Sequence, residues 1–288
     1  MAVYLAASDE TVGEGIFHHA GYVASIDCWN EVFVPAWKRD VLTGKPRLST
    51  FHMNDLRSER WRQRQGMTRD DVEARIDAAV DVLSRTEGLF AVWSSIDKAD
   101  FDKNAYRLGL EPNDPRRGRT KFEVDYLSFN WYAHHVLRYC SSNPAVERVD
   151  FMIEKKEVVF PTMEQFHAGL PTAFMGTQSP HFAQMVGELQ SGGKEEIRLQ
   201  AADVLCWHVQ RKCANARNPK IAFSEVDRKR FDAHTRRGAS FTMGREMVED
   251  LRSVLQMEAA KMKTRRLIQL SRSPGRLKGA LDGDASSG

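Results

Sequence analysis

Short apolar stretches alternate with helical patterns along most of this chain, and that alternation limits the possible folds more than any other feature. Residues 3–7, 15–26, 89–96 and 148–156 are apolar stretches of strand length. The clearest helix is predicted over 68–88. Strands that alternate with helices predict an α/β fold, in which functional side chains gather where strands end.

The helix predicted over 68–88 has the strongest signals at both ends. Thr68 is the expected N-cap, Asp71 lies in the positive first turn, and Gly88 is the expected stop. The residues of its apolar face are Val72, Ile76, Ala79, Val80 and Leu83. This face predicts a helix packed on the core.

Less regular patterns predict the remaining elements. Residues 27–42 have helical spacing, with Asp27 as the N-cap and Pro35 as a kink or break. Short strands are predicted over 47–56 and 181–189. Helices are predicted over 122–140, 162–170, 196–213 and 245–270. Residues 271–288 are rich in small polar residues, which predicts a disordered tail.

The composition is that of a globular protein with a sizeable core, since 42% of the 288 residues are hydrophobic and 28% are charged. No apolar run approaches the roughly 18 residues of a membrane span. We therefore expect no membrane partner and a cytoplasmic location. The four cysteines form no close pair, which predicts neither a disulfide framework nor a zinc ribbon.

Positive charge is concentrated towards the C-terminus. Residues 1–204 carry 24 Lys and Arg against 30 Asp and Glu, whereas residues 205–280 carry 18 against 7. A basic segment suits a polyanion such as nucleic acid, because each cation placed on a phosphate releases counterions. A solvated helix surface explains the same charge equally well.

Three acids on separate predicted elements have the clearest chemical potential. Asp9 follows the strand 3–7, Glu154 lies near the end of the strand 148–156, and Asp203 lies at the border of a helical apolar stripe. Each has an ordinary alternative role: a turn residue, an exposed strand residue paired with a lysine, and a boundary aspartate bonded to a loop.

Carboxylates from separate elements suit a divalent metal site. Mg²⁺ and Mn²⁺ prefer hard oxygen ligands and accept one or two carboxylates together with water and phosphate oxygens. Two such ions about 4 Å apart can activate a water molecule and stabilise the leaving oxygen in phosphodiester hydrolysis. Carboxyl groups more than about 8 Å apart could not share such ions.

Four short segments resemble the "domain of unknown function 3800" family. They are "SDET" near the N-terminus, "FHMND", "FMIEKK" and "LQAADVLCWHVQR", and the likeness covers roughly residues 3–213. Members of that family are similar to ribonuclease H-fold proteins: they open with a strand ending in an Asp-Glu-Ser type motif and close with a Leu-Gln-x-Ala-Asp helix. This chain departs from the opening motif, because Thr11 replaces the usual Ser and Val12-Gly13 replace the usual Gly-Asp.

The resemblance implies Asp9, Glu154 and Asp203 as catalytic residues and as ligands of Mg²⁺ or Mn²⁺. Secondary candidates are Glu10, His52 and Asp55. It implies a mixed sheet flanked by helices, and a nuclease that hydrolyses phosphodiester bonds of DNA or RNA. The basic groups expected to hold the nucleic-acid backbone are Arg116, Arg117, Arg119, Arg211, Lys212 and Arg217.

Taken together, these features predict a ribonuclease H-like domain over 1–215, a basic helical extension over 216–270 and the tail over 271–288. The alternative from another class is a non-catalytic module that binds nucleic acid or protein on the same fold. The helix 245–270 has a second candidate role as the interface of a homodimer or larger complex, with packing on the chain's own core as the simpler explanation.

Overall fold

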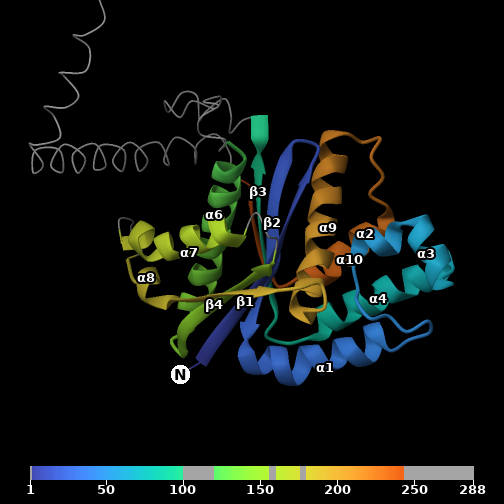
Figure 1. The fold of residues 1–288 in the computed structure, drawn as a ribbon, viewed down its shortest axis with the longest axis horizontal. Helices are drawn as coiled ribbons and strands as arrows, with labels where there is room; N and C mark the ends of the chain where they lie inside the picture. Colours follow the sequence, from blue (N-terminus) through green and yellow to red (C-terminus); the bar gives the residue numbers. More distant parts are fainter. Residues whose placement is uncertain (1, 100–119, 156–159, 176–179, 243–288) are drawn as a thin grey trace, which may run out of the picture.

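Helices cover both faces of one mixed β-sheet in this protein, as a computed structural model shows (Figure 1). The structure describes residues 2–99, 120–155, 160–175 and 180–242. The six strands of the sheet run in the order β5-β4-β1-β2-β3-β6. The expected α/β class with a mixed sheet and flanking helices is confirmed.

The strands are β1 (Ala2–Gly13), β2 (Ile16–Ser25), β3 (Phe90–Asp97), β4 (Val146–Glu154), β5 (Val186–Gly192) and β6 (Gly238–Thr242). β2 is antiparallel to its neighbours β1 and β3, whereas β4 is parallel to β1 and β5 is parallel to β4. β6 is parallel to β3. The strands predicted over 15–26, 89–96 and 148–156 are therefore confirmed.

β1 is longer than its sequence suggested, and this corrects the place of the opening acids. Asp9 and Glu10 lie inside β1, because the strand stays paired with β2 as far as Gly13. The hairpin turn uses two left-handed residues, Glu14 at φ 51° and Gly15 at φ 72°. What ends before Asp9 is the parallel pairing with β4, whose last pair joins Ser8 to Ile153.

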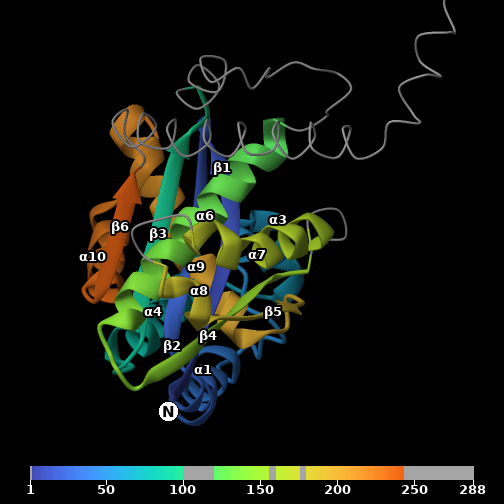
Figure 2. The same cartoon turned by 90° about the vertical axis from the view of Figure 1, so that its left-hand side faces the viewer.

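Two apolar cores lie on opposite faces of the sheet (Figure 2). One face is covered by η1 (Cys28–Phe33), α1 (Val34–Trp37), η2 (Lys38–Leu42), α2 (Met53–Arg57), α3 (Glu59–Gln65), α4 (Arg69–Arg85), α9 (Ile197–Arg217) and α10 (Glu225–Thr235). The other face is covered by α6 (Thr120–Ser141), α7 (Phe160–Met175) and α8 (Phe182–Met185). The site described below lies on the α9 face.

α4 has the cap and the buried face that the sequence predicted. The Thr68 hydroxyl accepts a hydrogen bond from the Asp71 amide, and the Asp71 carboxylate accepts one from the Thr68 amide, which completes a capping box. All five predicted face residues are buried. The helix ends at Arg85, three residues before Gly88, which adopts φ 86° in the turn before β3.

Three of the less regular predictions are wrong. Residues 47–52 form a loop that pairs with no strand of the described sheet and residues 53–57 form α2, and the apolar side chains Leu48, Phe51, Met53 and Leu56 are buried from both parts. Residues 181–189 divide between α8 and the start of β5. The helix predicted over 27–42 is present as the consecutive segments η1, α1 and η2, with the change from η1 to α1 next to Pro35, but Asp27 is itself helical and its side chain caps no amide of η1.

The described part of the predicted C-terminal extension is not wholly helical. The boundary expected after residue 215 falls within α9, and β6 beyond α10 pairs with β3 at the edge of the sheet. The predicted helix 245–270, with its dimer role, and the tail 271–288 lie outside the described residues. Among the described helices, none is both long and apolar enough to cross a membrane.

Candidate functional site

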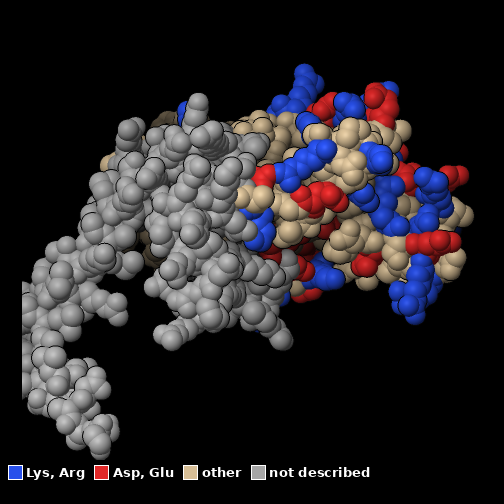
Figure 3. Space-filling model, turned by 90° about the horizontal axis from the view of Figure 1, so that it is seen from above, with Lys and Arg blue, Asp and Glu red and all other residues tan. Residues whose placement is uncertain are grey.

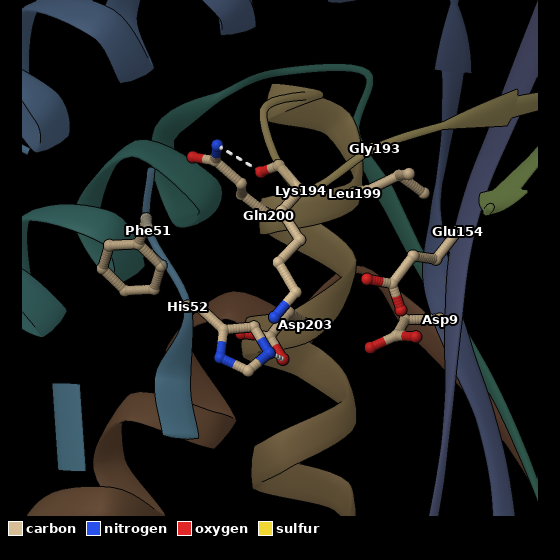
Figure 4. Close-up of a pocket in the computed structure, with 9 residues that line it drawn as sticks. All are labelled: Asp9, Phe51, His52, Glu154, Gly193, Lys194, Leu199, Gln200 and Asp203. Carbon is tan, nitrogen blue, oxygen red and sulfur yellow. Dashed lines mark hydrogen bonds and ion pairs between the residues drawn. The ribbon is translucent and has the colours of Figure 1, made fainter. Parts of the chain in front are cut away.

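Asp9, Glu154 and Asp203 line one cavity on the α9 face of the sheet (Figure 4). His52 and Lys194 line the same cavity. A second cavity of about 340 Å³ shares all five of these residues and continues along α9 to Trp207 and Gln210. The three acids that the resemblance selected therefore lie around one connected space.

The register of the sheet brings Asp9 and Glu154 together. Ser8 pairs with Ile153, so Asp9 and Glu154 occupy the next position of two neighbouring parallel strands. Side chains alternate between the faces of a strand, and both Ala7 and Met152 pack in the core on the α9 face. Two residues further on, Asp9 and Glu154 belong to that same face.

Asp203 reaches the cavity from α9, which packs across β1 and β2. Its side chain is 13% exposed. One oxygen, Oδ2, accepts a hydrogen bond of 2.6 Å from the Met53 amide at the start of α2. The other, Oδ1, lies 3.7 Å from His52 Nε2. Asp203 is thus a boundary aspartate bonded to a neighbouring segment, and it also faces the two strand acids.

The surroundings of Asp203 disfavour its negative charge. Burial is the main cause that raises its pKa from 3.8 to about 7. The negative charges of Asp9 and Glu154 raise the pKa further, whereas His52 and the Met53 amide act in the opposite direction. Asp203 therefore shares a space with two other carboxylates, and this arrangement makes its ionised form less stable.

The secondary candidates differ in their distance from this cluster. His52 lines both cavities, and its Nδ1 lies 3.5 Å from Asp55 Oδ2. Asp55 therefore contacts His52 and is not among the residues that line the cavities. Glu10 lines the larger cavity but not the smaller one, although alternation along β1 assigns its position to the opposite face from Asp9.

Only one of the three predicted basic groups on α9 lies next to the site. The Arg211 guanidinium lies 5.5 Å from the centre of the Trp207 ring, which lines the larger cavity. Lys212 lies over the Phe231 ring, and Arg217 forms an ion pair with Asp97. Lys212 and Arg217 are thus held away from the carboxylates.

Arg116, Arg117 and Arg119 lie outside the described residues. On the described part of the face seen in Figure 3, Lys and Arg are interspersed with Asp and Glu. The described residues of this face therefore form no continuous basic band.

Sequence reasoning assigned no site role to ten residues that line the two cavities, and those with polar or aromatic groups of interest include Asn54, Lys194, Gln200, Trp207 and Gln210. Trp207 and Gln210 follow Asp203 at one and two helical turns, so helical periodicity could have found them. Lys194 lies in "SGGKEE", where no periodic pattern points to the site. Its place depends on how β5 connects to α9.

The carboxylates fit Mg²⁺ or Mn²⁺ by chemical type and by their shared cavity. All three offer hard oxygen ligands, and the charges of Asp9 and Glu154 that raise the pKa of Asp203 are charges that a cation would offset. Within the described residues, no three His, Cys, Asp or Glu side chains are already arranged to hold a metal ion. The match to Mg²⁺ or Mn²⁺ therefore depends on the type of ligand atoms and not on a preformed coordination geometry.

No protein-family model, curated protein or solved structure matches this chain. The resemblance in the sequence consequently remains a prediction.

Proposed function

We propose that this protein hydrolyses phosphodiester bonds in nucleic acid with the help of Mg²⁺ or Mn²⁺. One observation carries the proposal: Asp9, Glu154 and Asp203, from two adjacent strands and one helix, line a single cavity. These are the residues that the family resemblance implies as metal ligands. The pKa of Asp203 is raised by burial and by both other acids, which supports a shared electrostatic site.

We further propose that the fold is ribonuclease H-like. Its support is the mixed sheet with helices on both faces, and the origin of the three acids. Asp9 comes from the first strand, Glu154 from the strand beside it and Asp203 from the later helix α9. This is the distribution that the resemblance implies.

The chain's own residues have distinct roles in this proposal. Asp9, Glu154 and Asp203 would hold the cations. When bound, a divalent cation supplies Lewis acidity towards phosphate oxygens and makes water more acidic. His52 lies between two carboxylates, 3.7 Å from Asp203 Oδ1 and 3.5 Å from Asp55 Oδ2, where its ring could orient a water molecule or the substrate.

The shape of the larger cavity favours a chain-like substrate over a small phosphate ester. The cavity runs beyond the carboxylates to Trp207 and Gln210. Arg57 and Arg211 lie over the Trp207 ring at 5.0 and 5.5 Å from its centre. Arg57 is neutralised by Glu73 and Asp227, whereas Arg211 has no carboxylate partner among the described residues. Arg211 is therefore available for a flanking phosphate.

The test is a cleavage assay on single-stranded, duplex, hybrid and RNA substrates with Mg²⁺ or Mn²⁺. We expect Asp9→Asn and Asp203→Asn each to reduce cleavage by at least about 10²-fold, as the loss of a charge-stabilising catalytic group does. Asp203→Asn keeps a side-chain oxygen that can accept from the Met53 amide, so the fold should survive that change.

Asp232→Asn is the matched control, because Asp232 is an exposed aspartate on α10 that lines neither cavity. It should leave the rate unchanged. Cleavage that survives both site substitutions would refute the mechanism. A chain that binds these nucleic acids and never cleaves them would instead favour the non-catalytic module.

A further inference from the structure

Lys194 lies at the mouth of the cavity, on the turn between β5 and α9. The residue is exposed, and its side chain extends into the space lined by the carboxylates and His52 (Figure 4). It forms no ion pair with any carboxylate of the described residues. An ammonium group is therefore present in a cavity whose other charged groups are acids.

The backbone of this turn is fixed by a buried glutamine. Gln200 Nε2 donates a hydrogen bond of 3.0 Å to the carbonyl oxygen of Lys194. Gln200 Oε1 in turn accepts a hydrogen bond of 3.0 Å from Trp37 Nε1. Gln200 is 3% exposed and Trp37 is fully buried. Both polar atoms of the Gln200 side chain are thus hydrogen-bonded. The position of the Lys194 backbone therefore depends on Trp37, a buried core residue of α1.

The same turn is attached to the strand that carries Glu154. Glu154 pairs with Gly192 in the β4–β5 ladder, and the Lys155 amide donates a hydrogen bond of 2.9 Å to the Gly192 carbonyl. The Glu196 amide then closes the turn on the Gly193 carbonyl at 3.0 Å. The turn that carries Lys194 is therefore bonded to the end of β4, where the proposed metal ligand Glu154 lies.

We propose that Lys194 binds the phosphate group that is cleaved, and that Gln200 is the residue that positions it. The inference rests on the proposed function, since it assigns a role at the same site. A phosphate that approaches three carboxylates is repelled by them, and a compact ammonium with three N–H donors offsets that repulsion. Its charge also stabilises the negative charge that gathers on the phosphate oxygens during hydrolysis. No proton transfer is assigned to Lys194.

The first experiment compares Lys194→Met with Lys220→Met, a control at an exposed lysine beyond the end of α9. We expect Lys194→Met to lower kcat about 10²-fold with an unchanged melting temperature, and Lys220→Met to change neither. Equal rates for the two variants would overturn the inference.

The second experiment measures binding without divalent ions, so that nothing is cleaved. The probe is a fluorescein-labelled single-stranded oligonucleotide, as DNA and as RNA, titrated at several salt concentrations. For a single strand, one lost phosphate contact lowers the magnitude of the slope of log K against log salt by about 0.7. We expect this change for Lys194→Met and not for Lys220→Met. An unchanged slope for Lys194→Met contradicts the proposed contact.

Gln200→Leu tests the positioning role, and Trp37→Phe, which removes the donor to Gln200, is a second route to the same change. Both should lower the salt slope in the same direction as Lys194→Met. Adding Lys194→Met to Gln200→Leu should then cause little further loss, because the two changes remove one contact. Full additivity of the two losses would contradict the positioning role.

The two proposals can fail separately. If the wild-type protein cleaves nothing but Lys194→Met still lowers the salt slope, the nuclease proposal fails and the phosphate contact remains. If the wild type cleaves and Lys194→Met matches it in rate and slope, only the role of Lys194 is refuted.

Discussion

At Gly21 the strand β2 lies too close to β1 to leave room for a side chain. A Cβ at this position would collide with the Ala7 carbonyl oxygen and lie 2.6 Å from Ser8 Cα. Both neighbours are backbone, so neither can rotate away. Gly21 pairs with Ser8, the residue before Asp9. The close contact therefore helps to fix the position of β1, the strand that carries Asp9.

Gly21→Ala should lower the free energy of unfolding by about 1–3 kcal/mol, because the added methyl group must displace a strand. Gly169→Ala is the matched control. Gly169 lies inside α7, and a Cβ there would meet nothing within 4 Å. That change should raise stability by about 0.5–1 kcal/mol. Urea denaturation of both variants measures the difference, and equal effects would contradict the close contact.

The ionised Asp203 carboxylate should lower the free energy of unfolding at high pH. Its pKa is about 7 in the folded protein and 3.8 when unfolded, so the folded state binds more protons between these values. Stability from this group is therefore present at acid pH and falls as the pH rises through about 7.

Asp203→Asn removes this charge, so it should raise the free energy of unfolding at pH 8 by about 1–3 kcal/mol without divalent ions. The gain should vanish near pH 4, where Asp203 is largely neutral. Mg²⁺ should stabilise the wild type more than the variant. Melting temperatures at both pH values, with and without Mg²⁺, measure this. A variant less stable than the wild type at pH 8 would contradict the expectation.

At the scale of elements, α4 and α9 show how differently two helices can be read from their sequences. α4 has one buried face and an explicit capping box, so its pattern predicts its place. α9 is buried on most sides, because the sheet lies under it while α1, α2 and α10 pack around it. A helix buried all round has little amphipathic pattern, and the direction of Asp203 depends on its neighbours.

The cap of α4 gives a prediction for that element. Thr68→Ala should cost about 1 kcal/mol of the free energy of unfolding, because the Asp71 amide loses its acceptor. Ser49→Ala is the control, because Ser49 is an exposed residue in the segment between η2 and α2 and caps none of the described helices. Chemical denaturation of the two variants gives the comparison. A loss as large for Ser49→Ala would show that the cap contributes nothing specific.

At the scale of the whole molecule, buried histidines occur on both faces of the sheet. Burial is the main cause that lowers the pKa of His18 and His208 to about 4 and that of His135 to about 3. Each binds a proton more readily when unfolded, where its pKa is 6.5. Their contribution to stability is present above about pH 6.5 and is lost as the pH falls towards 4.

The free energy of unfolding should consequently decline between pH 6.5 and 4, because the three histidines together outweigh the opposite effect of Asp203, and His208→Gln should weaken that decline. His181→Gln is the control, because His181 is exposed. Denaturation curves across this pH range measure both slopes. An identical decline in His208→Gln and in the wild type would remove His208 from the explanation.

Much of the fold could be predicted from local patterns, and part of it could not. Apolar runs of strand length predicted the strands 15–26, 89–96 and 148–156. Helical periodicity and a cap predicted the helix 68–88. Residues 47–56 misled because an apolar run of strand length can equally lead into a short helix. β6 lies in a stretch predicted as helical extension, and it becomes a strand by pairing with the exposed edge of β3.

The sequence by itself predicted three candidate acids: Asp9 from the end of an apolar stretch, Glu154 from strand alternation and Asp203 from the border of a helical stripe, together with a family resemblance. Only the tertiary structure decided that they share one cavity, with Lys194 at its mouth. The reason is physical. Alternation and helical spacing set the face of a single element, whereas strand register and the packing of α9 set the relation between elements, through contacts distant in sequence.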